Sequence, residues 1–597
     1  MPTINPFTLN VAEMTRLLDP HAPLIPELEQ ARSNPHALHG TRQVGEFLEY
    51  SAPLLASIGQ MPQTDYSAYR RYIRDGDRRE YEAAYFGKRT RLAAAALRLF
   101  LGSDPALPLA DTVHNYLWNI CEESNWVLPA HERCRVDLFA AETAFMLADA
   151  LNLLGDQIAP EVRARVRAEV EQRVFKPYLQ HHALEWWYLG DNNWNGVCNS
   201  SVAAAFLLLE PEPVRVAEAL VIALRGLDHF LSVAFEADGG SNEGVAYWHY
   251  GLFNLLALSE LLRARTNGQI DLLDSERMRR IAAYPAKMQL SGSAYAAFSD
   301  CDETLTFHPG FLTRLLERTG EQSLRNLLVQ TTELREHWRL TMMLRSILWW
   351  DGTRPAVATI DDAILPDCGV ARLTSHAPDG SQIVVAIKAG HNAENHNQND
   401  IGSIIVHVDG ENLLTDPGRG LYSRFYFGPQ RYDNIFANSY GHSVPRIDGQ
   451  LQLPGRNYIG QLLGAERSAG MARVEVELAG AYAVPQLGSL RRELAVMDDG
   501  TIRLADTIQF AGTSLAVEEA LVTWAECVLD ADNRAAAHIH GQRHTLHLMI
   551  EEPIGATFAL EQLEQQSRAN LKDGILKRLS VALPLGTQRF ILRMVVE

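Results

Sequence analysis

The sequence is short of cysteine, and the few cysteines it has are not grouped. Six cysteines are scattered over 597 residues, and no two of them form a CxxC pair. This spacing excludes a disulfide framework and a zinc finger. A reducing cytoplasm is therefore the expected compartment.

Positive charge is also scarce. The chain has 54 Lys and Arg against 73 Asp and Glu, which gives a formal net charge of −19. No basic stripe is visible, and this excludes nucleic acid as the expected partner. A protein of this charge can still bind an anionic ligand, but only through a local cluster of cations.

Long apolar runs are lacking as well. No run approaches the roughly 20 residues of a membrane span, so we expect no membrane segment. Residues 1–20 contain neither a basic region nor an apolar region of the kind found in signal peptides. We expect a cytoplasmic protein, or a periplasmic one if an export signal has been removed.

The length exceeds that of one ordinary core, so two or three domains are expected. Hydrophobic residues make up 47% and charged residues 21%, as in soluble globular proteins. Apolar residues recur at helical spacing through the first half, with short connections that suggest a bundle, a solenoid or an α/α toroid. The expected helices include 89–101, 135–154, 160–175, 197–209, 213–235, 244–263 and 274–290.

The pattern changes near residue 350. From Gly369 onward the apolar residues alternate in short runs between Gly, Asp and Pro turns, which is typical of an antiparallel β-sandwich. The expected strands include 382–387, 403–408, 472–477, 502–510 and 545–551. We therefore predict a helical domain over 1–350 and a β-sandwich domain over 351–597, joined by a linker at 351–364 that includes Pro355.

The most polar stretch lies within the predicted β domain. Two histidines and four asparagines occur between His391 and Asp400, and an alternating strand pattern follows. So many hydrogen-bonding groups make a poor core and a good polar site. A solvated loop is the alternative interpretation.

Three stretches of the helical half also carry chemistry. In 118–131, Glu122 and Trp126 suit sugar binding, because an aromatic face stacks on a pyranose. Packing of helix ends would explain the same residues.

The second stretch is 190–199. Asn192, Asn195 and Asn199 fall on one predicted helical face, although one of them is expected to be an N-cap.

The third stretch is the segment 238–250, which reads DGGSNEGVAYWHY. Glu243, Tyr247 and Tyr250 are spaced at i, i+4 and i+7, which places a carboxylate and two phenols on one predicted helical face. A tyrosine stripe with this spacing usually belongs to a core. The glycine-rich entry and Glu243 favour a cleft instead.

Together these stretches resemble the heparinase II/III-like polysaccharide lyases. The resemblance is carried in order by ICEESNWVLPAH, NNWNG, DGGSNEG with YWHYG, HNQND, LLTDPG and HSVPRIDG. It implies an N-terminal α/α toroid, a C-terminal antiparallel β-sandwich, and β-elimination of uronate-containing polysaccharides in the cleft between them. The partner it implies is an anionic oligo- or polysaccharide, glycosaminoglycan-like or alginate-like.

The resemblance also implies roles for individual residues. Asn193 matches the residue that neutralises the substrate carboxylate, with Asn192 as the fallback, and Tyr250 and His396 match the catalytic Tyr and His. Trp194 stands where some relatives carry His. The substrate-binding residues expected around these positions are Asn192, Trp194, Asn195, Glu122, Trp126, Glu243, Tyr247, His249 and His391.

One departure concerns a metal. Related lyases hold a structural zinc ion through residues that correspond to Gln398, Asp416 and His442, and Gln is a poor zinc ligand compared with imidazole. We therefore expect no required cofactor and less than one zinc ion per chain, with Asp416 and His442 in a hydrogen-bond network or bound to a metal through His391.

An arginine-rich segment follows at 419–432. Arg419, Arg424 and Arg431 are interleaved with tyrosines, and arginine forks match carboxylate and sulfate groups. We predict that this loop binds the anionic groups of the substrate. An ordinary surface loop is the alternative.

Two other functions stay open at this point. A glycoside hydrolase would use a carboxylate pair, such as Glu243 with Glu122 or Asp238. A non-catalytic carbohydrate-binding protein would keep the fold without the reaction. The sequence also leaves the oligomeric state open, with a homodimer as one option.

Overall fold

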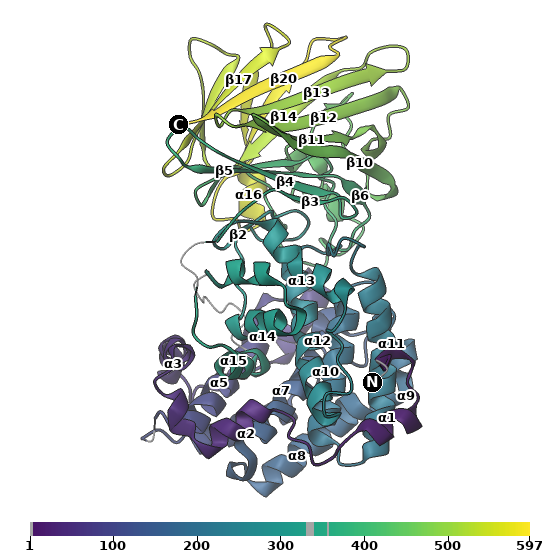
Figure 1. Ribbon diagram of the computed structural model, residues 1–597, viewed down its shortest axis with the longest axis vertical. Coiled ribbons are helices and arrows are strands. Elements are labelled where there is room, and N and C mark those ends of the chain that lie inside the picture. The colour runs from purple at the N-terminus through teal and green to yellow at the C-terminus, as the bar shows by residue number, and fades with distance from the viewer. Residues whose placement is uncertain (1–3, 105, 330–338, 355–357) are drawn as a thin grey trace. The chain divides into compact units, whose positions relative to one another are not determined.

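The structure, a computed structural model, describes residues 4–104, 106–329, 339–354 and 358–597 (Figure 1). The chain divides into two compact units. The helical unit comprises Met1–Phe235, Tyr247–Ala282 and Thr306–Ala356, and the sheet unit comprises Glu236–Ala246, Ala283–Leu305 and Val357–Glu597. Two segments of the N-terminal half thus belong with the sheets. Pro355 of the predicted linker lies outside the described residues.

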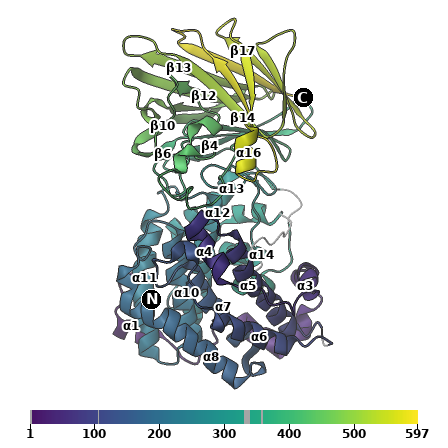
Figure 2. The same ribbon diagram turned by 180° about the vertical axis from the view of Figure 1, so that it is seen from behind.

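The first part of the chain is helical, as the periodicity predicts. The helices α5, α6, α7 and α8 pack against one another, and α10 packs on both α7 and α11 (Figure 2). The bounds are α1 Val11–Leu17, α2 Pro26–Ser33, α3 Arg42–Leu55, α4 Tyr66–Asp75, α5 Arg79–Leu101, α6 Leu109–Glu122, α7 Leu138–Leu154, α8 Pro160–Val170, α9 Lys176–His181, α10 Asn193–Leu209, α11 Pro213–Val233, α12 Val245–Arg265, α13 Glu276–Met288, α14 Pro309–Thr319 and α15 Leu340–Trp349.

Caps fix the ends of the helices that carry candidate residues. The Asn192 side chain accepts a hydrogen bond from the backbone N–H of Trp194 and so starts α10. Asp137 caps α7 in the same way, through the backbone N–H of Ala140. These caps set the first residue of each helix, and in α10 that residue is Asn193.

The most apolar helical segment runs over Leu138–Gln157 and contains α7. By length and composition alone this segment could cross a membrane. However, 83% of its apolar 18-residue stretch is buried inside the protein. Its hydrophobic residues are therefore explained by packing in the helical core, because a central helix has no solvent-facing side.

The sheet unit is built from antiparallel sheets. The largest has nine strands in the order β15-β16-β17-β20-β13-β12-β11-β10-β6, and others have the orders β3-β4-β5-β7-β8, β18-β19-β14-β9 and β1-β2. The bounds are β1 Gln289–Ser291, β2 Ala294–Tyr295, β3 Ala363–Leu365, β4 Val370–His376, β5 Gln382–Lys388, β6 Gly390–Asn392, β7 Ile404–Val408, β8 Glu411–Leu414, β9 Arg446–Ile447, β10 Gly455–Ser468, β11 Met471–Glu477, β12 Leu487–Met497, β13 Ile502–Phe510, β14 Val517–Thr523, β15 Glu526–Leu529, β16 Ala536–His540, β17 Thr545–Glu552, β18 Phe558–Gln562, β19 Lys577–Ala582 and β20 Arg589–Val596, with a short helix, α16 Glu564–Ala569.

One hydrophobic core joins these sheets. It includes Ile383 and Val406 of the five-stranded sheet, Leu494 and Leu592 of the nine-stranded sheet, and Leu579 of the four-stranded sheet. Alternating residues of a strand enter this core, as Ile404, Val406 and Val408 of β7 do. The fold class predicted from sequence, a helical region followed by an antiparallel β-sandwich, is confirmed.

A tight turn sets the register beside the polar stretch. Asp409 and Gly410 both adopt positive φ, at 43° and 100°, and they connect β7 to β8 so that Val408 pairs with Glu411. Two consecutive residues with positive φ are typical of the hairpin turns that match strand twist. The turn keeps His407 and Asn412 side by side, with His407 Nδ1 2.7 Å from Asn412 Oδ1.

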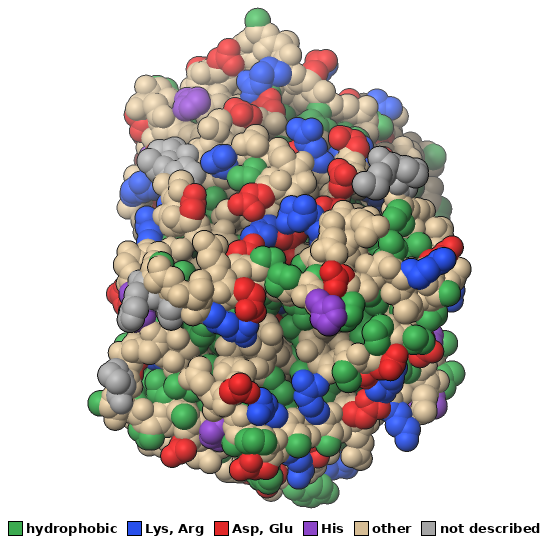
Figure 3. Space-filling model, turned by 60° about the horizontal axis from the view of Figure 1, so that its bottom comes forward, with side chains coloured by type: hydrophobic (Ala, Val, Ile, Leu, Met, Phe, Trp, Pro, Cys, Tyr) green, Lys and Arg blue, Asp and Glu red, His purple; other side chains and the backbone are tan. Residues whose placement is uncertain are grey.

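Acidic and basic side chains are interspersed on the face shown in Figure 3. Ion pairs between such side chains occur among the described residues, for example the Glu260 carboxylate with Arg318 in the helical unit, with Nε 2.6 Å from Oε1. Charges of the two signs are thus mixed on the face shown in Figure 3, and neither sign is concentrated there.

Candidate functional site

A buried phenol forms the centre of the candidate site in the helical unit. Tyr250 of α12 donates its hydroxyl hydrogen to Oε2 of Glu142 on α7, at 2.8 Å. Arg339 Nε lies 2.9 Å from the other oxygen of that carboxylate, and its guanidinium carbon is 4.3 Å from the centre of the Tyr250 ring. Asn254, one turn further along α12, also donates to Glu142, at 3.4 Å.

Burial controls the charge of this group. Burial raises the pKa of Tyr250 well above 10, and the neighbouring Glu142 carboxylate raises it further against the opposing effect of Arg339. Burial also raises the pKa of Glu142, and Arg339 with the Tyr250 hydroxyl opposes that rise. Tyr250 therefore keeps its proton at neutral pH and is suited to donate it.

Asn193 lies against the same part of α12. A Cβ built on Gly251 would sit 3.6 Å from the Cβ of Asn193, so the glycine lets α10 and α12 approach closely at this point. Asn193 is buried, with 2% of its surface exposed. The predicted neutralising Asn and the predicted catalytic Tyr are thus neighbours in the helical unit.

Aromatic rings surround the start of α10. The Trp194 ring packs against His131 at 4.6 Å and against Trp186 at 4.8 Å, measured between ring centres. The Nδ1 atom of His131 lies 2.8 Å from the Asp137 carboxylate. Trp186 is 55% exposed, so one large aromatic side chain is available to stack on a sugar. Sequence reasoning did not single out Trp186.

The other asparagines of this stretch are structural. Asn192 is the N-cap. Asn195 donates to the carbonyl of Gly190 and accepts from Asn199, at 3.1 and 2.8 Å, and both residues are fully buried. The prediction that Asn195 contacts substrate is therefore replaced by a role in holding the entry to α10.

Two further predictions for the helical unit are wrong because the residues are packed in the core. Trp126 is 1% exposed and donates its indole N–H to the carbonyl of Ile120, so its faces are not free for a sugar. His249 packs between Phe307 and Phe311, and burial holds its pKa well below 6.5. Glu122 is exposed, as a substrate-binding residue requires, and accepts from the indole of Trp118 at 2.8 Å.

The sheet unit holds a second centre at His396. His396 has a positive φ of 58°, and Ser299, which precedes its partner Asp300, has one of 64°. Left-handed backbone at non-glycine residues is strained and concentrates at functional sites. The backbone N–H of Asp300 donates to the carbonyl of His396 at 3.2 Å, which binds the two strained segments together.

Asp300 orients the imidazole. His396 Nδ1 lies 3.1 Å from Asp300 Oδ2, and the hydroxyl of Tyr422 is within 3.3 Å of both groups. The other carboxylate oxygen accepts from Tyr426 and Gln398, at 2.8 and 3.1 Å. With Nδ1 engaged, His396 presents Nε2 for proton transfer, as in other carboxylate–histidine pairs.

Cations and donors keep Asp300 ionised although it is completely buried. Burial alone would raise its pKa, but the hydrogen bond from His396 and the charge of Arg431 lower it from 3.8 to about 2. Arg431 contributes a guanidinium nitrogen 2.8 Å from Asp300 Oδ2. Sequence reasoning missed Asp300; its only signal is the short acidic run Asp300, Asp302, Glu303.

The segment that introduces α12 also lies at this centre. Glu243 precedes the helix and belongs to the sheet unit, where its Oε1 is 3.9 Å from His396 Nε2. The prediction that Glu243 shares a helical face with Tyr247 and Tyr250 is therefore wrong, because the helix begins only at Val245. Tyr247 is half-buried on α12.

The three arginines of the loop after Gly418 differ in role. Arg431 donates to the carbonyl of Asn397 and pairs with Asp300, so its prediction as a substrate contact is corrected to a support for the His396 centre. Arg419 lies 3.3 Å from Asp302 and over the Tyr422 ring. Arg424 is exposed and lies over the exposed Phe425 ring at 5.3 Å.

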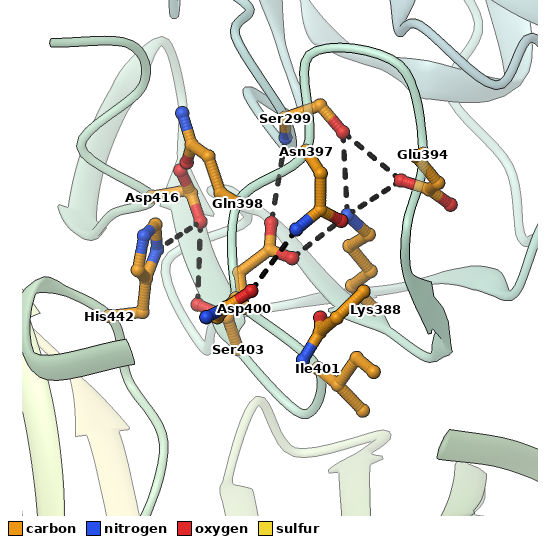
Figure 4. A network of polar contacts seen from close by, with 12 residues as sticks. Ser299, Lys388, Glu394, Asn397, Gln398, Asp400, Ile401, Ser403, Asp416 and His442 are labelled. Atoms are coloured by element: carbon orange, nitrogen blue, oxygen red, sulfur yellow. Dashed lines mark hydrogen bonds and ion pairs between the residues drawn. The ribbon is translucent and has the colours of Figure 1, made fainter. Parts of the chain in front are cut away.

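A buried polar cluster lies next to this centre (Figure 4). Asp416 Oδ2 is 3.0 Å from His442 Nδ1, as predicted, and Asp400 completes a group whose ligand atoms all lie within 4.8 Å of one another. The Gln398 amide nitrogen donates to Asp300 instead, while its Oε1 atom is buried with no hydrogen-bond partner among the described residues. His391 is also separate, with its Nδ1 accepting from the backbone N–H of Ala393.

A zinc ion does not fit this cluster as it stands, because Lys388 is already there. Its ammonium is 2.8 Å from Asp400 and 2.9 Å from Glu394, and it is 2% exposed (Figure 4). Burial alone would lower the pKa of Lys388, but the two carboxylates raise it above its usual range. A divalent ion on Asp400 would stand within a few ångströms of this buried ammonium, and that repulsion is strong away from water.

Comparison with known proteins identifies a family match in the C-terminal part of the chain. Residues 359–576 match the family model described as "Heparinase II/III-like, C-terminal". Among curated proteins, none matches the sequence.

Solved structures share the fold across both parts of the chain. A heparinase III structure is 15% identical with a TM-score of 0.61, and the match covers 86% of this chain and 77% of that one. The heparan sulfate lyase HepC from Pedobacter heparinus is 14% identical with a TM-score of 0.56, over 87% of this chain and 76% of that one. The resemblance to the heparinase II/III-like lyases is thus confirmed, with residues 359–576 forming a heparinase II/III-like C-terminal region.

Proposed function

We propose that this chain is a polysaccharide lyase that cleaves uronate-containing glycans of the glycosaminoglycan type by β-elimination. The observation that carries the proposal is the buried Tyr250 hydroxyl bonded to a Glu142 carboxylate that Arg339 holds, with Asn193 packed against Gly251, the next residue of α12. Solved structures with a similar fold include a heparinase III and a heparan sulfate lyase.

The reaction needs three groups. The proton at C5 of a uronate is hardly acidic while the adjacent carboxylate keeps its full charge, so a donor must neutralise that charge. A base then removes the proton, and an acid protonates the leaving glycosidic oxygen. The product is a new reducing end and an unsaturated uronate.

We propose one residue for each of these roles. We assign Asn193 to the substrate carboxylate, since an amide N–H can donate to it. His396 takes the proton through Nε2, because Asp300 engages Nδ1. Tyr250 serves as the acid, because burial and Glu142 keep it protonated. Arg419, which lies over the Tyr422 ring, and the exposed Arg424 are proposed to supply positive charge for an anionic chain.

A carboxylate-pair hydrolase has less support. The Asp238 carboxylate accepts backbone hydrogen bonds from Gly240, Asp367 and Cys368 and so holds a turn. Because both oxygens of Asp238 are engaged in holding this turn, the structure argues against it as one member of a catalytic pair.

The test is the ultraviolet absorbance of the unsaturated product on a panel of heparan-type, chondroitin-type and alginate chains. We expect absorbance with at least one uronate chain, loss of it in Tyr250→Phe and His396→Asn, and full activity in Tyr66→Phe, a control at an exposed tyrosine. New reducing ends without absorbance would indicate a hydrolase, and binding without cleavage would indicate a carbohydrate-binding protein.

A further inference from the structure

Two histidines face each other on the outer surface of the nine-stranded sheet. His538 of β16 and His547 of β17 are directly paired in the register, and their Nδ1 atoms are 2.8 Å apart. Their rings are nearly perpendicular, at 73°. The neighbouring residue on β15, Val528, is 47% exposed, so this face of the sheet is open to solvent.

A carboxylate stands at the far side of each ring. His538 Nε2 is 3.3 Å from Asp530 Oδ2, and His547 Nε2 is 3.1 Å from Glu597 Oε2. The four side chains form one row, in which two imidazoles lie between two carboxylates. The histidine side chains are 27% and 34% exposed, so small solutes can reach them.

The contacts in this row need more hydrogens than two neutral imidazoles carry. Each neutral imidazole has one N–H, which gives two in all. Hydrogens in the nitrogen–nitrogen contact and in the His538–Asp530 hydrogen bond use both of them, and this leaves the lone pair of His547 Nε2 3.1 Å from the Glu597 carboxylate without a hydrogen bond. If both N–H groups point to the carboxylates, two lone pairs meet at 2.8 Å. A positive charge between the Nδ1 atoms, either an extra proton or a metal ion, resolves this.

We propose that His538 and His547 form a binding site for a divalent transition-metal ion such as Zn²⁺, Ni²⁺ or Co²⁺, held by the two Nδ1 atoms. A carboxylate at the outer ring nitrogen is the usual partner of a metal-bound histidine, because it fixes the tautomer that presents a lone pair to the metal. Both histidines have this partner. The two carboxylates also balance the two charges of the ion.

The geometry requires only a small adjustment. Zinc–nitrogen bonds of about 2.0–2.1 Å at a tetrahedral angle place two ligand nitrogens roughly 3.3 Å apart. The Nδ1 atoms must therefore separate by about half an ångström, which rotation of two half-exposed rings allows. Water would complete the coordination, so the expected affinity is that of a two-histidine site rather than that of a closed structural site.

The experiment is a metal titration of the full chain without an affinity tag, at pH 7.5, with Ni²⁺ and Zn²⁺ followed by calorimetry. We expect His538→Asn and His547→Asn each to weaken one binding event at least tenfold. His540→Asn is the matched control, since His540 lies two residues along the same strand and contacts Thr545 instead. It should leave the titration unchanged.

Two further readouts separate this site from other histidines. Replacing the shared proton by metal should release up to one proton per ion, measured by repeating the calorimetry in buffers of different ionisation enthalpy. Saturating Ni²⁺ should raise the melting temperature of the wild type and of His540→Asn more than that of the two site variants. Equal metal stoichiometry and affinity in the wild type and both site variants would overturn the proposal. A shared proton, rather than a metal ion, would then join the two histidines. Lyase activity is not used as a readout, so the test is independent of the proposed function.

Discussion

Replacing Asp300 with Asn tests the His396 centre, because the substitution keeps the shape of the side chain and removes its charge. Asp300 contacts His396, Tyr422, Tyr426 and Arg431. An amide at this position would no longer compensate the charge of Arg431. Both oxygens of the carboxylate accept hydrogen bonds, so the NH₂ group of the amide would face hydrogen-bond donors whichever way the amide is turned. Both stability and turnover should therefore fall.

The magnitude follows from the pKa and from the buried ion pair. Lowering the pKa of Asp300 from 3.8 to about 2 corresponds to roughly 2–3 kcal/mol of folding free energy. Breaking a buried ion pair by removing one partner costs about 3–5 kcal/mol. We therefore expect a loss of about 2–5 kcal/mol in the sheet unit. At roughly 2–4 °C per kcal/mol, its melting temperature should fall by about 4–20 °C.

The sign of the pH dependence follows from the same shift. Because the folded-state pKa is lower than the unfolded one, the stabilisation is present above about pH 4 and is lost as the pH falls toward 2. Acid unfolding of the wild type should show this loss, and Asp300→Asn should show a weaker dependence in that window. Turnover should fall by about 10²–10⁴-fold, because His396 loses the partner that presents its Nε2 atom.

The assay combines melting, acid titration and product absorbance in the wild type, Asp300→Asn and Asp302→Asn. Asp302 is the matched control, since its side chain is 38% exposed and its ion pair with Arg419 is solvated. Such pairs contribute about 0–1 kcal/mol. An Asp300→Asn variant that melts and turns over like Asp302→Asn would refute the role given to Asp300.

Four other predictions concern the remaining parts of the site. Tyr250→Phe should lower turnover by about 10²–10⁴-fold with KM nearly unchanged, and a near-normal rate would reassign the acid. Glu142→Gln should also lower kcat and should destabilise the helical unit by about 3–5 kcal/mol, because Arg339 loses its buried partner; unchanged melting would contradict the network. The purified chain should contain less than one zinc ion and keep its activity in chelators, since Lys388 occupies the charged cluster; elemental analysis showing one tightly bound zinc would contradict this. Arg424→Gln should raise KM and weaken its salt dependence without lowering the melting temperature, and unchanged kinetics would place the anionic groups elsewhere.

The elements were predictable because they depend on local patterns. The expected helix 213–235 is α11, Pro213–Val233, and the expected strand 502–510 is β13, Ile502–Phe510. The apolar periodicity fixes such elements without knowledge of their neighbours. The candidate Tyr250 and His396 followed from sequence motifs, and both lie in buried polar networks.

The partners of those residues were not predictable. Glu142 sits in an apolar helix 108 residues before Tyr250, and Asp300 lies 96 residues before His396. Their pairing depends on tertiary packing, and nothing in the local sequence distinguishes a paired carboxylate from a solvated one. Trp126 was misassigned for the same reason, because an aromatic residue beside carboxylates has the same local sequence pattern in a protein core and in a sugar-binding site.

The central claim is tested most directly by running the reaction in water labelled with oxygen-18 and weighing the products. β-Elimination breaks the C–O bond without adding water, so the products should carry no label from the cleavage step and should end in an unsaturated uronate. Incorporation of one labelled oxygen per cleavage, with saturated ends, would show hydrolysis and contradict the account.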